Sequence, residues 1–551
     1  MRATRRDLLA IAAAAAAITS CGQRPQAAHA AQTVLPSEAA WRVLSRLSFG
    51  ATMAQMQALQ AAGLSAWLDA QLQADPADEP TVAQRLKSYR LKIEYEAGEV
   101  LTGSRYGARK ELRPLGAMWK TGAELWRLVD YELPVAWDER WRPADEMRAA
   151  SLIRAVHAER QLREVMVDFW HNHFNVAFYA EPQVAVMLPD YDRAIRRHVF
   201  GDFRKLLGEV AASPAMLRYL NNDQNRGSPA NENYARELFE LHTLGAPAYH
   251  GPGRPANWRS GYGEDDVKAA ARAFTGWTIA AGQQIAGDDW AENDGTFLIL
   301  PQWHDFGPKT VLGRVLPAMN SPQADGEAVL DAAASHPATA RFIGAKLVRR
   351  LVSDTPPPAL IDKAATAFAA HAGRDDQIAQ TLRAIILDPA FVAPGVMKTK
   401  RPFEFIASFL RATGTQAEAG PDVWLLLSSA GWRQFDWGAP TGHPDSAAPW
   451  INSNALIEQW NLISAAVAGL GDAGHVDLWK PAASVDKRAD ALAALWHQHM
   501  LGRAPTPEAL AALVSLAPDG RGDAVLTGSG GKEALEKMVL ALAMSPAFME
   551  R

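Results

Sequence analysis

The sequence predicts a mainly α-helical protein, organised as a large multi-helix domain with a small β-hairpin or extended insertion. Apolar residues recur at helical spacing through most of the chain, and stretches rich in Gly and Pro separate these periodic segments. Of the 551 residues, 48% are hydrophobic and 21% are charged, which is ordinary globular composition. A chain of this length and composition has enough apolar material to bury a large core.

Composition also narrows the classes of function. The formal net charge is -5, so no basic field indicates a nucleic-acid partner. The single cysteine is Cys21, so the rest of the chain can form neither a disulfide nor a thiolate metal site. Eighteen Trp residues are a high count. They can serve as packing anchors between helices or as a platform for flat ligands such as sugar rings.

Residues 1–30 are predicted to be a twin-arginine signal peptide. Arg5 and Arg6 precede an uncharged, mostly alanine run from Leu8 to Thr19. A basic start followed by an apolar stretch of this length is typical of a leader and is too short for a membrane-spanning helix. We therefore expect the protein in the periplasm or secreted by the twin-arginine route.

Two processing sites are possible at the end of the leader. Residues 28–30 have the A-x-A form of ordinary cleavage, which we favour, and 18–21 resemble a lipobox that would place a lipid on Cys21. In the second case the protein would be a lipid-anchored envelope protein, and that lipid would be its sole membrane contact. Residues 31–36 then look like a flexible tether.

Residues 37–551 are predicted to form the helical domain. Amphipathic helices are expected to continue through about residue 245 with short breaks. Residues 281–325 differ, because short apolar runs are separated there by a stretch with polar residues and prolines. They predict a small hairpin or an irregular insertion.

A short pattern recurs after three apolar helices, at residues 213–216, 388–391 and 545–548. In each case Ser or Asp precedes Pro, Ala and a large apolar residue. Ser and Asp are good helix caps, and Pro suits the first helical position because the N–H that it lacks has no partner there. The pattern predicts a helix corner that is used three times.

The segment 161–175 contains the first group of residues that could bind a metal or take part in a reaction. Apolar side chains occupy one face of the expected helix. A second face is formed by Glu164, Asp168, His171 and Asn175. Asp168 and His171 are one turn apart, so they can bind one divalent metal ion from a single helix. His173 points to the opposite side of that helix.

The segment 221–245 carries the second group. An Asn- and Asp-rich loop leads into a helix with Glu237 and Glu240 on its polar face and His242 on its apolar face. Oxygen-rich segments of this kind can hold a hard cation. Carboxylates near a helix start can equally serve capping and the helix dipole.

One hypothesis joins the two segments into a metal site. The expected ligands of the divalent ion are Asp168, His171, Glu237 and Glu240, with His173, Arg236 and His242 as supporting or acid–base groups. One alternative is a buried network of ion pairs, in which Arg163 or Arg236 neutralises the carboxylates and the histidines belong to the core. Another is a catalytic or binding site at these residues that holds no metal.

Several longer motifs resemble the bacterial domain-of-unknown-function 1800 family. They are RLSFGAT at 46–52, DFWHNHF at 168–174, NENYAREL at 231–238, FTGW at 274–277, HPATARF at 336–342 and WINS at 450–453. The resemblance extends from about residue 37 to the end of the chain. It implies an exported helical protein without an assigned activity, so it gives no residue a role. Residues 441–445 depart from the Gly-Trp pair expected in that loop.

Two functions follow from these observations. The first is an exported, metal-dependent enzyme acting on a small molecule or polysaccharide of the envelope or the extracellular space. The second is a non-catalytic envelope protein that binds an exported partner protein or a polysaccharide through exposed Trp side chains and long loops.

Overall fold

The computed structural model describes residues 5–17, 35–73, 75–227, 229–251, 260–393, 398–417, 419–469 and 476–551. The structure is 59% helical, with 25 α-helices and five two-stranded antiparallel sheets in these ranges. The prediction of a mainly α fold with small β insertions is therefore confirmed.

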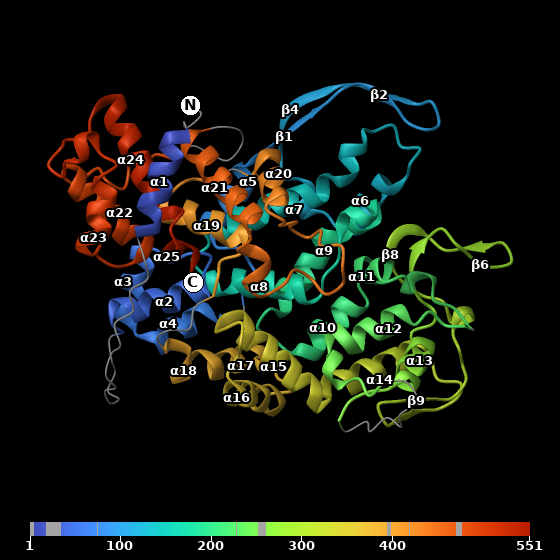
Figure 1. Cartoon of the computed structure of the whole chain (residues 1–551). Coiled ribbons are helices and arrows are strands. Elements are labelled where there is room, and N and C mark those ends of the chain that lie inside the picture. The colour runs from blue at the N-terminus through green and yellow to red at the C-terminus, as the bar shows by residue number, and fades with distance from the viewer. Residues whose placement is uncertain are drawn as a thin grey trace.

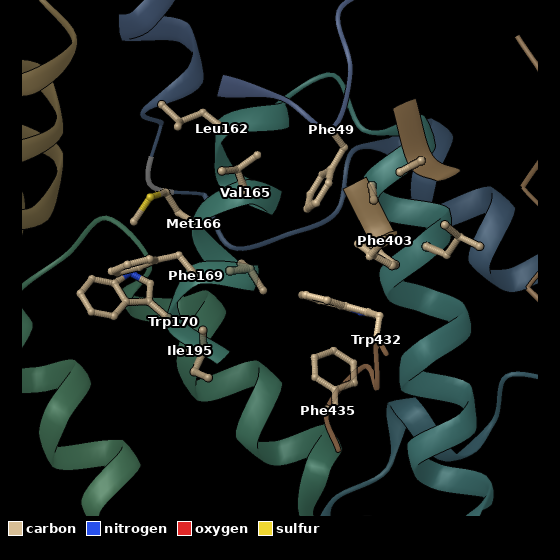
Figure 2. Close-up of a cluster of buried hydrophobic side chains, with 14 of the residues drawn as sticks. Phe49, Leu162, Val165, Met166, Phe169, Trp170, Ile195, Phe403, Trp432 and Phe435 are labelled. Carbon is tan, nitrogen blue, oxygen red and sulfur yellow. The ribbon is translucent and has the colours of Figure 1, made fainter. Parts of the chain in front are cut away.

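Helix α8 (Gln161–His173) lies at the centre of the molecule, and every residue in it except Asn172 is buried (Figure 1). It packs against α7 (Trp137–His157), α9 (Pro182–His198), α2 (Ser37–Leu47) and α4 (Leu64–Gln71), and α19 (Pro402–Thr413) packs against α7. Figure 2 shows its apolar side chains beside residues from distant segments, among them Phe49, Phe403, Trp432 and Phe435. This burial gives α8 little contact with solvent on either of its predicted faces.

The other helices pack around this centre, and α15 to α17 stack in succession. Their bounds are α3 (Met53–Ala62), α5 (Pro80–Ser88), α6 (Gly122–Leu125), α10 (Phe203–Ala211), α11 (Pro214–Tyr219), α12 (Asn233–Glu237), α13 (Glu264–Ala273), α14 (Pro322–Ser335), α15 (Pro337–Leu351), α16 (Pro358–Ala370), α17 (Gln377–Ile386), α18 (Pro389–Val392), α20 (Pro421–Ser429), α21 (Ser453–Ala468), α22 (Ala489–Leu501), α23 (Pro507–Val514), α24 (Gly528–Ala543) and α25 (Pro546–Met549).

The Pro start of the recurring corner is confirmed at all three places, and its side-chain cap at two of them, because Ser213 makes no cap hydrogen bond. Helices α11, α18 and α25 begin at Pro214, Pro389 and Pro546, each in the first helical position. The side chains of Asp388 and Ser545 accept hydrogen bonds from backbone N–H groups of the helices that they cap. The corner is thus a local device that the sequence specifies directly.

The predicted insertion is present and begins slightly earlier than residue 281. Strand β5 (Trp277–Ala281) pairs with β8 (Asn293–Ile299), and two shorter pairs follow the same antiparallel pattern. These are β6 (Gln284–Ala286) with β7 (Asp289–Trp290), and β9 (Lys309–Val311) with β10 (Arg314–Leu316). Trp277 anchors the insertion, since it is buried and its indole N–H donates to the Pro322 carbonyl at 3.0 Å.

A second β excursion was not predicted. The expectation of helices with only short breaks up to residue 245 is wrong at 90–114, where β1 (Arg90–Tyr95) pairs with β4 (Arg109–Pro114). The ribbon continues outward through β2 (Gly98–Glu99) and β3 (Arg105–Tyr106) and projects from the helical body (Figure 1). Apolar and charged residues alternate along β1 with the period of two that a strand requires, and this pattern overrides the helical one.

The predicted leader is described only in part. Helix α1 (Arg5–Ala17) packs against α23 and α24, where Ile11, Ala14 and Ala15 are buried (Figure 1). Both proposed processing sites, at Cys21 and at residues 28–30, lie outside the described residues, as does most of the tether. No helix among the described residues is long and apolar enough to cross a membrane.

Candidate functional site

Asp168 lies between two arginines rather than at an open site. Its Oδ2 accepts hydrogen bonds from Arg401 at 2.5 Å and from Arg350 at 3.3 Å. Both guanidinium groups also reach Glu404, at 2.6 and 3.1 Å, and Arg551 is 3.2 Å from the same carboxylate. Burial opposes ionisation there, but the three arginines hold the pKa of Glu404 well below its usual range. The charge of Asp168 is therefore compensated by protein groups.

His171 lines the same small hollow of about 10 Å³ as Asp168 but belongs to a second buried network. Its Nε2 is 2.9 Å from Asp192, which also contacts Arg196 at 2.8 Å. Arg196 forms a two-point ion pair with Glu164, at 3.0 and 2.9 Å. Despite its burial, Asp192 has a strongly lowered pKa, because Arg196, His171 and Arg154 stabilise its charged form.

These networks match the structural alternative, but with different cations from those expected. Arg163 does not neutralise a carboxylate of α8; its guanidinium donates to the backbone carbonyls of Ala77 and Pro76. Arg236 pairs with Glu264 at 2.8 Å and with Glu232 at 3.0 Å. The arginines that neutralise α8 come from α9, α15 and the start of α19.

His173 and His242 lie together in the core. Nε2 of His173 is 3.0 Å from the His242 backbone carbonyl, and the two rings are 6.2 Å apart. Nδ1 of His173 and Nε2 of His242 have no hydrogen-bond partner among the described residues. Burial, together with the charge of Lys346, lowers the pKa of His242 to about 3. Both imidazoles are therefore neutral at physiological pH, in surroundings that include the rings of Phe174 and Phe342.

Glu237 and Glu240 lie where the helix changes its winding. After α12, residues Leu238–His242 form a turn of π-helix (η5), which holds more residues per turn than an α-helix. The regular face that the sequence predicted is therefore interrupted between the two glutamates. Burial and the nearby charge of Glu240 raise the pKa of Glu237.

The four expected ligands are not assembled into one site. Among the described residues, no group of three or more His, Cys, Asp or Glu side chains is placed to hold a metal ion. Asp168 and His171 instead contact separate sets of arginines and carboxylates. Their spacing on one helix is as expected, but both side chains are engaged in buried contacts within the protein.

A groove of about 820 Å³ lies against α7. We call it the aromatic groove, and it is bordered by β1, α7, α20 and the segments at 178–179 and 433–436. The aromatic side chains that line it are Tyr95, Trp137, Trp141, Phe178, Tyr179 and Trp424. Charged side chains of both signs lie between them.

Four rings in contact form a ridge beside this groove, which we call the aromatic ridge: Tyr131, Trp137, Trp141 and Tyr179. The rings of Trp137 and Trp141 meet edge to face, at 5.8 Å and 75°. Trp141 stacks on Tyr179 at 5.0 Å and 24°, and Tyr131 stacks on Trp137 at 5.9 Å and 25°. Trp137 is 49% exposed and Tyr179 is 61% exposed. A further hollow of about 510 Å³ lies against the same four rings and extends to Arg218. Large aromatic faces thus remain open beside two adjoining spaces.

Cations and backbone contacts hold the ridge in place. The Arg148 guanidinium lies over the Phe178 ring at 4.7 Å, and that of Arg140 lies over Tyr131 at 5.4 Å. The backbone N–H of Tyr179 donates to Asp436 at 3.0 Å. Rings held in this way lose little freedom when a ligand stacks on them.

Two carboxyl groups of the aromatic groove are less fully compensated than those beside α8. Asp145, whose side chain is 39% exposed, pairs with Arg148 at 3.1 Å, and its partial burial raises its pKa. Burial also raises the pKa of Asp436. Glu139, in contrast, accepts hydrogen bonds from Arg113 at 2.9 and 2.8 Å and from the Tyr95 hydroxyl at 2.8 Å. Asp145 and Asp436 can exchange hydrogen bonds with the hydroxyl groups of a ligand.

The family model described as "Protein of unknown function (DUF1800)" matches residues 42–550, which is nearly the whole chain. The protein belongs to this family. No curated protein and no solved structure matches the chain. The description of the DUF1800 family names no activity, so the functional argument depends on the geometry of this chain.

The loop at 441–445 of this DUF1800 protein closes onto the end of α8. The backbone N–H of His443 donates to the Asn172 side chain at 2.6 Å, and its ring stacks on Trp432 at 3.9 Å. Gly442 has φ +71°, and a Cβ there would meet the Asn172 carbonyl oxygen at 2.1 Å. Glycine is required at this close approach. The Gly-His sequence therefore serves packing against α8.

Proposed function

We propose that this protein is exported and binds a polysaccharide in the aromatic groove without cleaving it. The observation that carries the proposal is the aromatic ridge, in which Trp137 and Tyr179 stay exposed beside two adjoining hollows. Sugar rings present C–H faces that stack on aromatic side chains, and hydroxyl edges that need polar partners. The groove offers both, since Asp145 and Asp436 lie beside the rings.

The shape of this region favours a chain over a single small molecule. Two hollows of about 820 and 510 Å³ meet at the same rings, so consecutive units of a polymer can contact both sides of the ridge. An exported protein would meet such polymers in the cell envelope or outside the cell. The paired arginines near the N-terminus support export by the twin-arginine route.

A binding role accounts for these features better than the metal-dependent enzyme does. Among the described residues no three potential ligands are placed to hold a metal ion, Asp168 is paired with two arginines, and His171 is hydrogen-bonded to Asp192. The aromatic groove, in contrast, combines open apolar faces with polar groups in a concave surface, which is the usual character of a ligand site.

The test is a binding titration of the full chain against a panel of soluble neutral and acidic polysaccharides. We expect Trp137→Ala and Tyr179→Ala each to weaken binding about tenfold, because each removes one open stacking surface. Trp290→Ala is the matched control, since Trp290 is 63% exposed on β7 and lies outside the groove. Failure of every polysaccharide to bind, or unchanged affinity in both ridge variants, would refute the proposal.

A further inference from the structure

One wall of the aromatic groove is the edge of a β-strand. Residues 91–95 of β1 all line the groove, although successive side chains of a strand point to opposite faces. A strand with only one face toward the groove would line it with alternate residues. The uninterrupted run therefore indicates that an edge of β1 faces the groove, and β4 occupies the other edge.

The register of the ribbon determines which backbone groups lie on this edge. The Val100 N–H donates to the Ser104 carbonyl at 2.9 Å, so these residues form a hydrogen-bonded pair beside the turn. The β2–β3 and β1–β4 pairs share one register, because two residues separate them on each strand. Hydrogen-bonded and non-hydrogen-bonded pairs alternate along an antiparallel ladder. Counting back from the turn places Leu91, Ile93 and Tyr95 in non-hydrogen-bonded pairs, so their backbone N–H and C=O groups point away from β4.

These backbone groups have no partner within the described part of the chain. No described residue exchanges a hydrogen bond with the main chain of Leu91, Ile93 or Tyr95 on the side away from β4. The unpaired groups recur at every second residue, which is the spacing at which an extended peptide presents complementary groups. Polysaccharides have no such series of backbone amides, so this edge suits a different ligand from the ridge.

The side chains beside the edge indicate which peptides would fit. Leu91 and Ile93 lie on the less exposed face of β1, whereas Lys92 and Glu94 are exposed on the other face. A strand added to β1 would continue both faces, so its residues should alternate between apolar and polar. Across the groove lies Leu425 of α20, which is 66% exposed and offers a further apolar contact.

We propose that β1 binds an extended polypeptide segment of a partner protein, which joins the β1–β4 ribbon as a third strand. Main-chain hydrogen bonds supply the affinity in this mode of recognition, and the alternation of side chains supplies the selectivity. Proteins usually cover or blunt an open strand edge because it pairs readily with other chains. This binding goes beyond the polysaccharide function and does not depend on it, since the strand edge and the aromatic ridge are different walls of the groove.

The test selects binders to the full chain from a displayed library of short random peptides. We expect enriched peptides with alternating apolar and polar residues, and about tenfold weaker binding of these peptides by Ile93→Pro. Proline at this position removes an N–H that faces the groove and leaves the ladder with β4 intact. Glu111→Pro is the matched control and should bind as the wild type does. Glu111 is the register partner of Ile93, so its N–H points to the opposite edge of the ribbon.

N-methylated forms of an enriched peptide give a second readout that needs no protein variant. Methylation of alternate backbone nitrogens should weaken binding where the N–H faces β1 and leave it unchanged at the positions between. Contacts through side chains alone would show no such alternation. The proposal is overturned if no peptide is enriched, if Ile93→Pro binds the enriched peptides as tightly as the wild type, or if the effect of methylation does not alternate. Ile93→Pro should keep the wild-type affinity for polysaccharide, so each of the two proposals can fail without the other.

Discussion

The surroundings of α8 and the aromatic groove are both rich in charged and aromatic side chains, yet they differ in what those side chains contact. Around α8, each carboxylate meets guanidinium groups at hydrogen-bond distance and away from solvent. In the groove, aromatic faces are open and Asp145 and Asp436 have few cation partners. A dense group of titratable residues in the sequence is thus no guide to a ligand site by itself. The guide is whether their charges are already compensated within the protein.

The largest effect on stability that tests this comparison is expected from substitution of Asp168. Removing its carboxylate leaves Arg350 and Arg401 buried, with Glu404 as their remaining ion-pair partner among the described residues and the Asp445 charge nearby. We expect Asp168→Ala to lower the free energy of unfolding by about 3–5 kcal/mol, as measured by urea denaturation. The affinity of the folded protein for polysaccharide should stay unchanged.

Asp145→Ala provides the matched control for that variant. Asp145 has one ion pair with Arg148, and its side chain is 39% exposed. Its loss should therefore cost at most about 1 kcal/mol of stability. If Asp168→Ala kept full stability but lost a stoichiometric metal ion, the claim that the charges beside α8 are compensated within the protein would be wrong.

A second prediction concerns the dependence of stability on pH. His242 has a pKa of about 3 in the folded protein and about 6.5 when unfolded. Below pH 6.5 the unfolded chain binds a proton that the folded chain does not, so the free energy of unfolding falls as pH decreases from 6.5 toward 3. Above pH 6.5 this group has no effect. The contribution of one such histidine is about 1.4 kcal/mol per pH unit.

His242→Phe should reduce the slope of the free energy of unfolding against pH by the contribution of one proton. The replacement keeps an aromatic ring beside Phe174 and removes a nitrogen that has no partner among the described residues. Urea denaturation at pH 8, 6 and 5 gives the slope, and the pH 8 value is the internal control because His242 is neutral there in both states. An unchanged slope would mean that His242 is accessible to protons in the folded protein.

Local features of this fold could be read from the sequence because they depend on neighbouring residues. The Ser-Pro and Asp-Pro corners, the burial of α8 and the β insertion after Trp277 all follow from spacing and turn chemistry. The partners of Asp168 could not be read in this way. Arg350 and Arg401 lie 182 and 233 residues away, and no local pattern specifies which cation meets which carboxylate.

The aromatic groove could be predicted only in outline. The high Trp content suggested a platform for sugar rings, and Trp137 and Trp141 are one helical turn apart on α7. The groove also needs β1 and the segments near 178 and 424, which tertiary packing brings together. The β1–β4 ribbon was missed because charged residues occupy most of its positions, which resembles an exposed helix when the alternation is not weighed.

The smallest expected effect concerns Glu237 and Glu240, which resemble neither region. They are three residues apart across the start of the π-helical turn, and neither has an ion-pair partner among the described residues. Together with burial, the charge of Glu240 raises the pKa of Glu237. The two carboxylates therefore repel, and Glu240→Gln should raise the free energy of unfolding by about 0.3 kcal/mol. It should also return the pKa of Glu237 toward its ordinary range, which NMR titration of the carboxyl group would detect.

Glu232→Gln is the control, and its effect on the free energy of unfolding should be opposite. It removes the ion pair with Arg236 at 3.0 Å and should therefore lower stability by about 0.3 kcal/mol. A loss of stability in Glu240→Gln would indicate a cation bound at this pair, and only then would these two glutamates return as candidate ligands.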